Sequence, residues 1–298
     1  MFFTDSYRAL GRGERALAAR YFVISILVLA VIGVPAGFYL LRRFEASATF
    51  HPERAALGGL WRVPAGAEEV WFETSDGVKL YGWLFRAAAR PAAATVVYFH
   101  GNGGNLSYCD WVGAELAARG FDVLLFDYRG YGRSGGEMTD ERGLYRDADA
   151  AYDFLTRGRG VPAREVVLYG QSLGTAAAAD VASRRGCGAL VLESGLSSAA
   201  DMAGEVIPWL PRFVRGLTKN KLDSVSKLPR VGCPVLVAHG DRDEIIPAAQ
   251  GRKLFEAAPE PKRLRIIEGA GHNDLSNVGG GQYIDSLADF IRDSVRRP

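Results

Sequence analysis

Ser172 has the sequence surroundings of a nucleophile. Residues 169–174 read Tyr-Gly-Gln-Ser-Leu-Gly, directly after the apolar run 165–168 and directly before the alanine-rich run 175–179. This order predicts a strand, a sharp turn and a helix, with the serine hydroxyl pushed out at the carboxyl edge of a sheet. Glycines fit beside the serine because such a turn leaves no room for larger side chains. By itself the motif is also consistent with a glycine turn that only starts a helix.

The base for this serine should come from one of four histidines. A serine hydroxyl needs a neighbouring base, most often a histidine that a carboxylate holds in one tautomer. His51 precedes the predicted folded domain, and His100 and His239 each end an apolar run. His272 follows a strand-like run and a glycine-rich loop, which can place its ring at the same sheet edge as Ser172. We therefore predict His272 as the base; the alternative is an ordinary loop histidine.

The acid should lie in a loop after a strand between the serine and the histidine. Residues 239–244 read His-Gly-Asp-Arg-Asp-Glu and follow the apolar run 234–238. Asp243 is the predicted acid, because the loop needs a few residues to turn from the sheet towards the histidine. Asp241 and Glu244 are expected to cap a helix that starts near Pro247 or to pair with Arg242.

A third glycine-rich segment could stabilise negative charge. Residues 100–105 read His-Gly-Asn-Gly-Gly-Asn between a predicted strand and a predicted helix. The backbone N–H groups of Asn102 and Leu173 are the predicted oxyanion hole, and Gly101 is expected to let the main chain approach a substrate. The alternative is a phosphate-binding glycine loop, but the segment lacks both the Walker ending and the Gly-X-Gly-X-X-Gly spacing.

Alternating elements position these residues. The runs 69–74 and 78–85 flank an Asp-Gly turn and predict a β-hairpin. Further on, short apolar runs alternate with segments of helical composition, and near-continuous apolar strands are typical of a parallel sheet that is covered on both faces. The predicted strands are 94–100, 121–127, 165–170, 189–193, 234–239 and 263–268, and the predicted helices are 105–119, 139–156, 172–185, 248–258 and 282–296. The sequence therefore predicts a doubly wound α/β domain with an antiparallel hairpin at one edge.

Five motifs together resemble the α/β-hydrolase serine hydrolases. They are residues 100–105, 127–134, 170–174, 239–243 and 271–274. The likeness runs from about residue 69 to the end and is greatest to a membrane-anchored branch, which includes eukaryotic α/β-hydrolase-domain depalmitoylases and bacterial relatives. It implies Ser172 as nucleophile, Asp243 as acid, His272 as base, a mostly parallel eight-stranded sheet, and neither a metal nor an organic cofactor. The chain lacks that branch's N-terminal cysteine cluster, so a protein substrate is not implied.

The motif at 127–134 reads Asp-Tyr-Arg-Gly-Tyr-Gly-Arg-Ser. We interpret it mainly as a structural turn in which glycines adopt unusual backbone angles and Asp127 pairs with Arg129.

The N-terminal segment predicts a membrane anchor. Residues 21–41 carry no charge and are long enough, as a helix, to cross a hydrocarbon core of about 30 Å. We predict a basic tail at 1–20, a transmembrane helix at 21–41, a connecting stalk at 42–65 and the hydrolase domain at 66–298. A cleaved signal peptide is the main alternative because residues 46–48 read Ala-Ser-Ala, although its apolar region is normally only about 7–15 residues. A buried core helix fits less well, since the run has no polar face.

The orientation of this anchor depends on flanking charge. Arginines are nearly balanced on the two sides of the span, and a charged N-terminal region before a single span favours an N-terminus inside. The main domain would then lie outside the cytoplasm, with a bacterial inner membrane as the expected location.

A lid is expected at about 200–228. Leu210, Phe213, Val214 and Leu217 would share one face of a short helix, and Trp209, Leu210 and Phe213 are predicted to contact an acyl chain. A helix buried against the sheet edge is the alternative.

Composition limits the function. The 298 residues carry a net charge of +2 with scattered basic positions, which excludes a nucleic-acid surface. Three distant cysteines indicate neither a disulfide framework nor a zinc site. We predict a membrane-anchored serine hydrolase for ester or thioester bonds of small acyl substrates, which we expect to be lipid-derived. A serine peptidase or aminopeptidase of the same fold and a non-catalytic scaffold are the alternatives.

Overall fold

The computed structural model describes residues 12–55, 62–209, 211–216 and 218–296, and it divides into two units between Ser47 and Ala48. Parts of four predictions lie outside the described residues: residues 1–11 of the basic tail, 56–61 of the stalk, Leu210 and Leu217 of the lid, and the last two residues of the domain.

The first unit is an apolar helix. It consists of α2 (Arg12–Val28), a π-helical turn (Leu29–Gly33) and all but the last two residues of α3 (Val34–Thr49). Within Ala19–Thr49, the most apolar 18-residue window has a mean hydropathy of 2.4, and none of its residues is buried inside the structure. By length and composition this helix could be a membrane span or a signal sequence.

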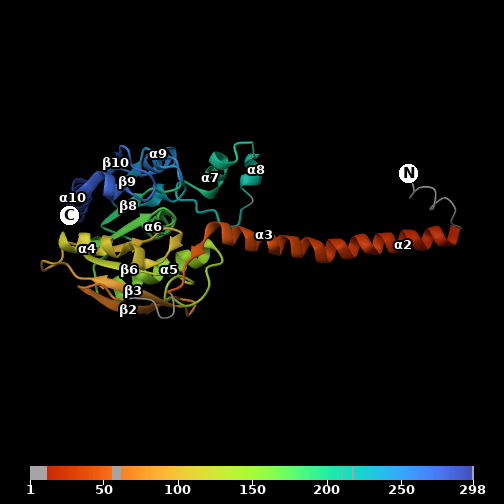
Figure 1. The fold of residues 1–298 in the computed structure, drawn as a ribbon, viewed down its shortest axis with the longest axis horizontal. Helices are drawn as coiled ribbons and strands as arrows, with labels where there is room; N and C mark the ends of the chain where they lie inside the picture. The colour runs from red at the N-terminus through yellow and green to blue at the C-terminus, as the bar shows by residue number, and fades with distance from the viewer. Residues whose placement is uncertain (1–11, 56–61, 210, 217, 297–298) are drawn as a thin grey trace. The chain divides into compact units, whose positions relative to one another are not determined.

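The second unit is built on an eight-stranded sheet (Figure 1). The strand order is β10-β9-β8-β7-β4-β6-β3-β2, and all neighbours are parallel except the pairs that β3 makes with β2 and β6. A separate two-stranded ladder pairs β1 with β5. The strands are β1 His51–Pro52, β2 Ala67–Glu73, β3 Lys79–Phe85, β4 Thr95–Phe99, β5 Gly103–Gly104, β6 Asp122–Phe126, β7 Val166–Gln171, β8 Ala189–Glu193, β9 Val235–Gly240 and β10 Lys262–Ile267.

Helices cover both faces of this sheet. On one face Leu144, Ala176 and Leu254 of α5, α6 and α9 pack in a core with Val97. On the other face α4 and α10 pack in a second core with Val96. Adjacent strand residues point to opposite faces, so apolar residues at every position serve both cores. The helices of this unit are α4 Asp110–Ala118, α5 Glu141–Asp153, α6 Gly174–Ala182, α7 Ala199–Val206, α8 Arg212–Arg215, α9 Ala248–Ala257 and α10 Leu275–Val295.

The predicted α/β class, its hairpin and its strands are confirmed. One helix begins earlier than predicted: α10 starts at Leu275 rather than near residue 282, because two helical pieces meet at Gly280, where φ is +57°. Only glycine adopts such an angle at little cost.

The predicted stalk requires a correction. Residues 42–49 are helical, and the segment after them packs into the second unit, where Phe50 is only 3% exposed. The second unit therefore begins at Ala48, not at residue 66. The sequence did not indicate this packing, because most hydrogen bonds of the segment come from main-chain groups. The types of the residues do not show where main-chain groups bond.

Candidate active site

The turn after β7 holds Ser172 in a strained conformation. Its φ is +53°, in the left-handed region that favours glycine. The Ser172 N–H donates to the Glu193 carbonyl oxygen at 2.9 Å, and the Thr175 hydroxyl donates to the Ser172 carbonyl at 2.7 Å. A Cβ on Gly174 would collide with the carbonyl oxygen of Phe99. The predicted strand, sharp turn and helix are therefore present, and glycine is required beside the serine.

Ser172, His272 and Asp243 form a continuous chain of hydrogen bonds. Ser172 Oγ lies 2.9 Å from His272 Nε2, and His272 Nδ1 lies 2.8 Å from Asp243 Oδ2. A carboxylate oxygen can only accept, so Nδ1 carries the imidazole proton and Nε2 can accept from the serine hydroxyl. All three residues are buried. The fold thus brings the three predicted residues together in the geometry that proton transfer from serine to histidine requires.

The Asp243 carboxylate accepts hydrogen bonds on both oxygens. Oδ1 accepts from the N–H groups of Ile245 and Ile246 at 2.9 and 2.7 Å. Oδ2 faces His272 Nδ1 and also His239 Nε2, which is 3.1 Å away. Burial alone raises the pKa of Asp243, but the hydrogen bonds from His239, His272 and Ile246 outweigh it and hold the pKa well below its ordinary value. The acid is therefore ionised at neutral pH.

His239 was not assigned a role from the sequence. Its Nε2 lies 2.7 Å from the Ile246 carbonyl oxygen and also faces Asp243 Oδ2, and both of these atoms accept, so Nε2 carries the proton. The ring is fully buried, and its Nδ1 has no partner among the described residues. His239 thus donates to the same carboxylate oxygen as His272 and helps to hold the carboxylate in place. His239 lies at the end of a strand, four residues before the acid. This spacing is the sequence signal that could have indicated the contact.

Asp241 has a different role from the one predicted. Its Oδ1 accepts the Gly269 N–H at 2.6 Å, so it joins the loop after β9 to the loop after β10. The first residue before α9 is Pro247, and no side chain caps this helix. Neither Asp241 nor Glu244 is therefore the helix cap that the sequence suggested.

The segment 100–105, here called the oxyanion loop, lies beside the serine. Asn102, Leu173 and Gly101 all line the same cavity as Ser172. Among the described residues, the N–H groups of Asn102 and Leu173 have no hydrogen-bond acceptor. A Cβ on Gly101 would come within 2.8 Å of the Gln171 side-chain oxygen. The geometry leaves two main-chain donors available beside the serine, as an oxyanion hole requires.

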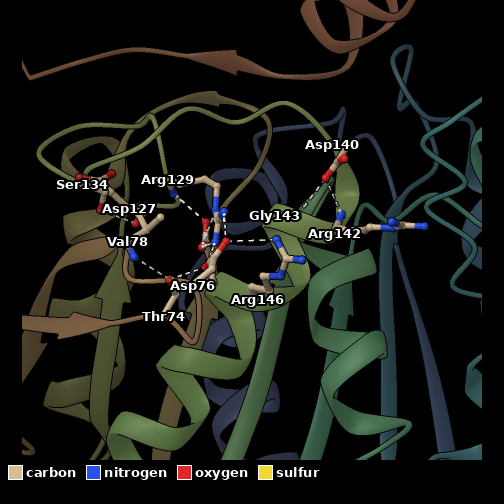
Figure 2. A network of polar contacts seen from close by, with 11 residues as sticks. Thr74, Asp76, Val78, Asp127, Arg129, Ser134, Asp140, Arg142, Gly143 and Arg146 are labelled. Atoms are coloured by element: carbon tan, nitrogen blue, oxygen red, sulfur yellow. Dashed lines mark hydrogen bonds and ion pairs between the residues drawn. The ribbon is translucent and has the colours of Figure 1, made fainter.

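Arg129 pairs with two carboxylates, and neither is Asp127. Its two terminal nitrogens donate to Asp76 at 2.9 Å each (Figure 2). Its Nε and backbone N–H donate to Asp147 at 2.9 and 2.7 Å. The predicted pair between Asp127 and Arg129 is therefore wrong. The two side chains leave the turn in different directions, and Arg129 instead joins the hairpin turn to α5, whose first turn is capped by Asp140 (Figure 2).

Asp127 is directed towards the chain just after the oxyanion loop. Its Oδ1 accepts the Leu106 N–H at 2.8 Å and its Oδ2 accepts the Arg133 N–H at 3.3 Å. Burial raises the pKa of Asp127 to about 7, although these two N–H donors oppose the shift. Gly132 has a φ of +45°, and a Cβ there would collide with this carboxylate. The turn at 127–134 is thereby fastened to the chain that follows the oxyanion loop.

A cavity of about 730 Å³ surrounds the serine. One part of its wall is apolar and comes from the segments after β8 and β9. The residues of this part are Leu196, Ala199, Met202, Leu222, Ile245 and Ile246. Another part comes from the oxyanion loop and its neighbours, with the side chains of Glu53, Tyr108 and Trp111. Within the described ranges, no group of three or more His, Cys, Asp or Glu side chains could hold a metal ion.

The lid contacts the cavity through α7, not through the aromatic residues predicted from the sequence. Trp209 and Phe213 are 82% and 75% exposed, and neither lines the cavity. Leu210 lies outside the described residues. Ala199 and Met202, three residues apart on one face of α7, line it instead. The sequence shows that the lid is amphipathic. It does not show whether the apolar face of so short a helix lines the cavity or is exposed.

Comparisons with known proteins agree with this fold. The model of the α/β-hydrolase fold matches residues 94–227. An uncharacterized protein from Mycobacterium tuberculosis is 37% identical over 233 residues, which cover 78% of this chain and 82% of that protein. α/β-Hydrolase domain-containing protein 17C from mouse is 34% identical over 226 residues, which cover 76% of this chain and 68% of that protein. The chain belongs to the α/β-hydrolase family.

Solved structures share the architecture of this α/β hydrolase. An esterase from Pyrococcus furiosus superposes with a TM-score of 0.67 over 83% of this chain and 97% of its own, at 19% sequence identity. At that identity the likeness concerns the fold. The resemblance predicted from five motifs is confirmed at the level of the family.

Proposed function

We propose that this α/β hydrolase is a serine hydrolase that cleaves carboxylic ester or thioester bonds of acyl substrates. The observation that supports the proposal is the hydrogen-bonded chain from Ser172 Oγ through His272 to Asp243 Oδ2 at the wall of a cavity. An ionised Asp243 fixes the imidazole tautomer in which Nε2 can accept a proton. Ser172 is the proposed nucleophile, His272 the base and Asp243 the acid.

Acylation begins at the serine hydroxyl. As Ser172 Oγ bonds to the substrate carbonyl carbon, its proton passes to His272 Nε2, and the carbonyl electron pair moves onto oxygen. The N–H groups of Asn102 and Leu173 donate to this oxyanion. Collapse of the intermediate breaks the bond to the leaving group, which takes the proton from His272. The products of this half are the free alcohol or thiol and an acyl ester on Ser172.

Deacylation repeats these steps with water. His272 Nε2 takes a proton from water as the water oxygen bonds to the acyl carbon, and the same N–H groups hold the second oxyanion. The bond to Ser172 Oγ breaks, and the serine oxygen recovers its proton from His272. The second product is the carboxylic acid.

The wall of the cavity indicates the substrate class. Leu196, Met202 and Leu222 offer an apolar surface that suits an acyl chain, and such sites typically combine apolar walls with a few placed polar groups. We infer that the substrates are small acyl esters or thioesters, with lipid-derived acyl groups among them. The P. furiosus protein of the same fold is named an esterase, which agrees with this reaction class.

A substrate panel tests the reaction class. We expect the full chain to hydrolyse p-nitrophenyl esters or acyl thioesters with a kcat/KM at least about tenfold above that for aminoacyl amides, a difference of about 1.4 kcal/mol in the transition state. Initial rates in detergent, with the Ser172→Ala variant as a blank, give the comparison. Faster turnover of the amides would favour the peptidase alternative, and no turnover of any substrate would favour the scaffold.

We also propose that the apolar helix anchors the enzyme in a membrane. Residues 21–41 are the proposed span, within the apolar stretch Ala19–Thr49. We propose a single pass with the catalytic unit on the extracytoplasmic side of a bacterial inner membrane, because a charged N-terminal region before a single span favours an N-terminus inside. An anchored catalyst would meet acylated lipids at high local concentration.

Carbonate extraction tests the anchor. The full chain should stay in the membrane pellet at alkaline pH, because an uncharged helix of this length loses its hydrophobic stabilisation on leaving the bilayer. Immunoblotting of pellet and supernatant, with intact mass of the protein as a control for cleavage, gives the result. Release into the supernatant together with loss of the N-terminal mass would identify a signal sequence instead.

A further inference from the structure

The chain that follows the apolar helix does not lead directly into the sheet. Residues 49–55, here called the strap, run first along the oxyanion loop, where β1 pairs in parallel with β5. The His51 N–H donates to the Asn102 carbonyl at 3.0 Å, and the Glu53 N–H donates to the Gly104 carbonyl at 3.2 Å. The strap thus holds the main chain of the loop that carries one of the two available N–H donors.

Side chains reinforce this ladder. Asn102 Nδ2 donates to the Thr49 carbonyl at 3.3 Å and lies 3.1 Å from His51 Nδ1. Asn105 Nδ2 reaches the Glu53 carbonyl at 3.4 Å, and the Tyr108 hydroxyl donates to the Glu53 carboxylate at 3.0 Å. Every one of these bonds joins the strap to the oxyanion loop or to the turn just after it.

The strap is also bonded to the turn at 127–134. The Gly132 N–H donates to the Glu53 carbonyl at 2.8 Å, and the Ala55 N–H donates to the Gly132 carbonyl at 3.0 Å. The Tyr131 hydroxyl from this turn donates to the Asn102 carbonyl at 2.9 Å. Phe50 is buried in the core that lies under α5 and α6. The strap is therefore held by the turn at 127–134 as well as by the oxyanion loop, and the turn also contacts that loop directly.

An oxyanion hole depends on such support. Three of the six residues of the loop are glycine, and glycine gains more freedom than any other residue when it is not held. Removing one donor from an oxyanion hole typically costs about 10²–10³ in kcat, because the donors must already be in place when charge develops. The pairing of His51 and Tyr131 with the Asn102 carbonyl fixes the peptide unit next to the Asn102 N–H.

We propose that the strap is a positioning element of the oxyanion hole. It acts through Asn102 and not on the substrate's reacting atoms. The expected effect of the strap on catalysis rests on the proposed hydrolase function. The restraint of the oxyanion loop by the strap does not depend on that function. The segment that leaves the apolar helix is in this way part of the active site and not a passive linker.

A matched pair of variants in the full chain isolates one bond. His51→Pro removes the N–H that donates to Asn102, whereas His51→Ala removes the imidazole and keeps the N–H. We expect kcat for a p-nitrophenyl ester to be at least about tenfold lower in the proline variant than in the alanine variant, with KM values within about twofold. Amide hydrogen exchange in a peptide covering residues 101–105 should be at least about tenfold faster in the proline variant.

The outcomes separate this inference from the proposed function. Equal kcat and equal exchange in the two His51 variants would overturn the strap's role even if the wild type is an active esterase. A wild type without esterase activity would overturn the proposed function, and the exchange measurement would still decide whether the strap restrains the loop. If the proline variant does not fold, Asn102→Ala decides, because it removes the contact with Thr49 and keeps the Asn102 N–H. Wild-type kcat and wild-type exchange in that variant would contradict the proposal.

Discussion

Ser172→Ala should lower ester turnover by several orders of magnitude, on the order of 10⁶ in a well-studied triad enzyme. The reason is that His272 Nε2, 2.9 Å from the hydroxyl, would have no proton to accept from an alanine side chain, and no acyl-enzyme could form. Residual turnover would come only from binding and from the oxyanion donors. The measurement is the initial rate with a p-nitrophenyl ester, for the full chain in detergent.

Thermal unfolding provides the control for this variant. Alanine keeps the backbone of the turn, where φ is +53°, and removes one atom from a site that already lines a cavity. The melting temperature should therefore stay within a few degrees of the wild type, since a stability change of about 1 kcal/mol shifts it by only about 2–4 °C in a domain of this size. Wild-type activity in a folded Ser172→Ala protein would mean that another residue is the nucleophile or that a contaminant causes the turnover.

Asp243→Asn should reduce turnover by about 10⁴, the loss known for a triad aspartate that becomes an amide. The amide nitrogen at this position would donate towards His272 Nδ1, which favours the tautomer whose Nε2 carries a proton and cannot accept one. The hydrogen bond from His239 would be weakened as well. Steady-state kinetics with the same ester measure the effect as a fall in kcat.

Asp241→Asn is the matched control for the acid. Asp241 lies two residues away in the same loop, but its carboxylate accepts the Gly269 N–H and does not face His272. We expect this variant to lose about 1 kcal/mol of stability at most and to keep kcat within about tenfold of the wild type. Circular dichroism must show that both variants are folded. Equal losses in the two variants, or a larger loss at Asp241, would contradict the assignment of the acid.

The three central residues could be predicted from the sequence for a physical reason. Ser172, Asp243 and His272 each follow a strand of a parallel sheet, and the carboxyl ends of such strands meet at one edge. Local patterns locate the strands, so the meeting point of the loops follows from the fold class. The oxyanion loop was predictable in the same way, because it follows β4, which pairs with β7.

The contacts that support these residues were not predictable, because they join segments that are distant in the chain. Arg129 finds Asp76 and Asp147 rather than its near neighbour Asp127, since the direction of each side chain depends on the tertiary path of the turn. The strap contacts the oxyanion loop through main-chain hydrogen bonds, which cannot be predicted from the types of the residues that make them. The same limit applies to the lid, where Met202 and not Trp209 lines the cavity.

The most direct test of the proposed hydrolase is the site of covalent modification by a fluorophosphonate. Such a probe mimics the acylation step, because an activated serine oxygen displaces fluoride and remains bonded to phosphorus. Mass spectrometry of digested full-length protein should find one adduct, on the peptide that contains Ser172, and the Asp243→Asn variant should react far more slowly. An adduct on a different residue, or no adduct on a folded wild-type protein, would contradict the assignment of Ser172 as an activated nucleophile.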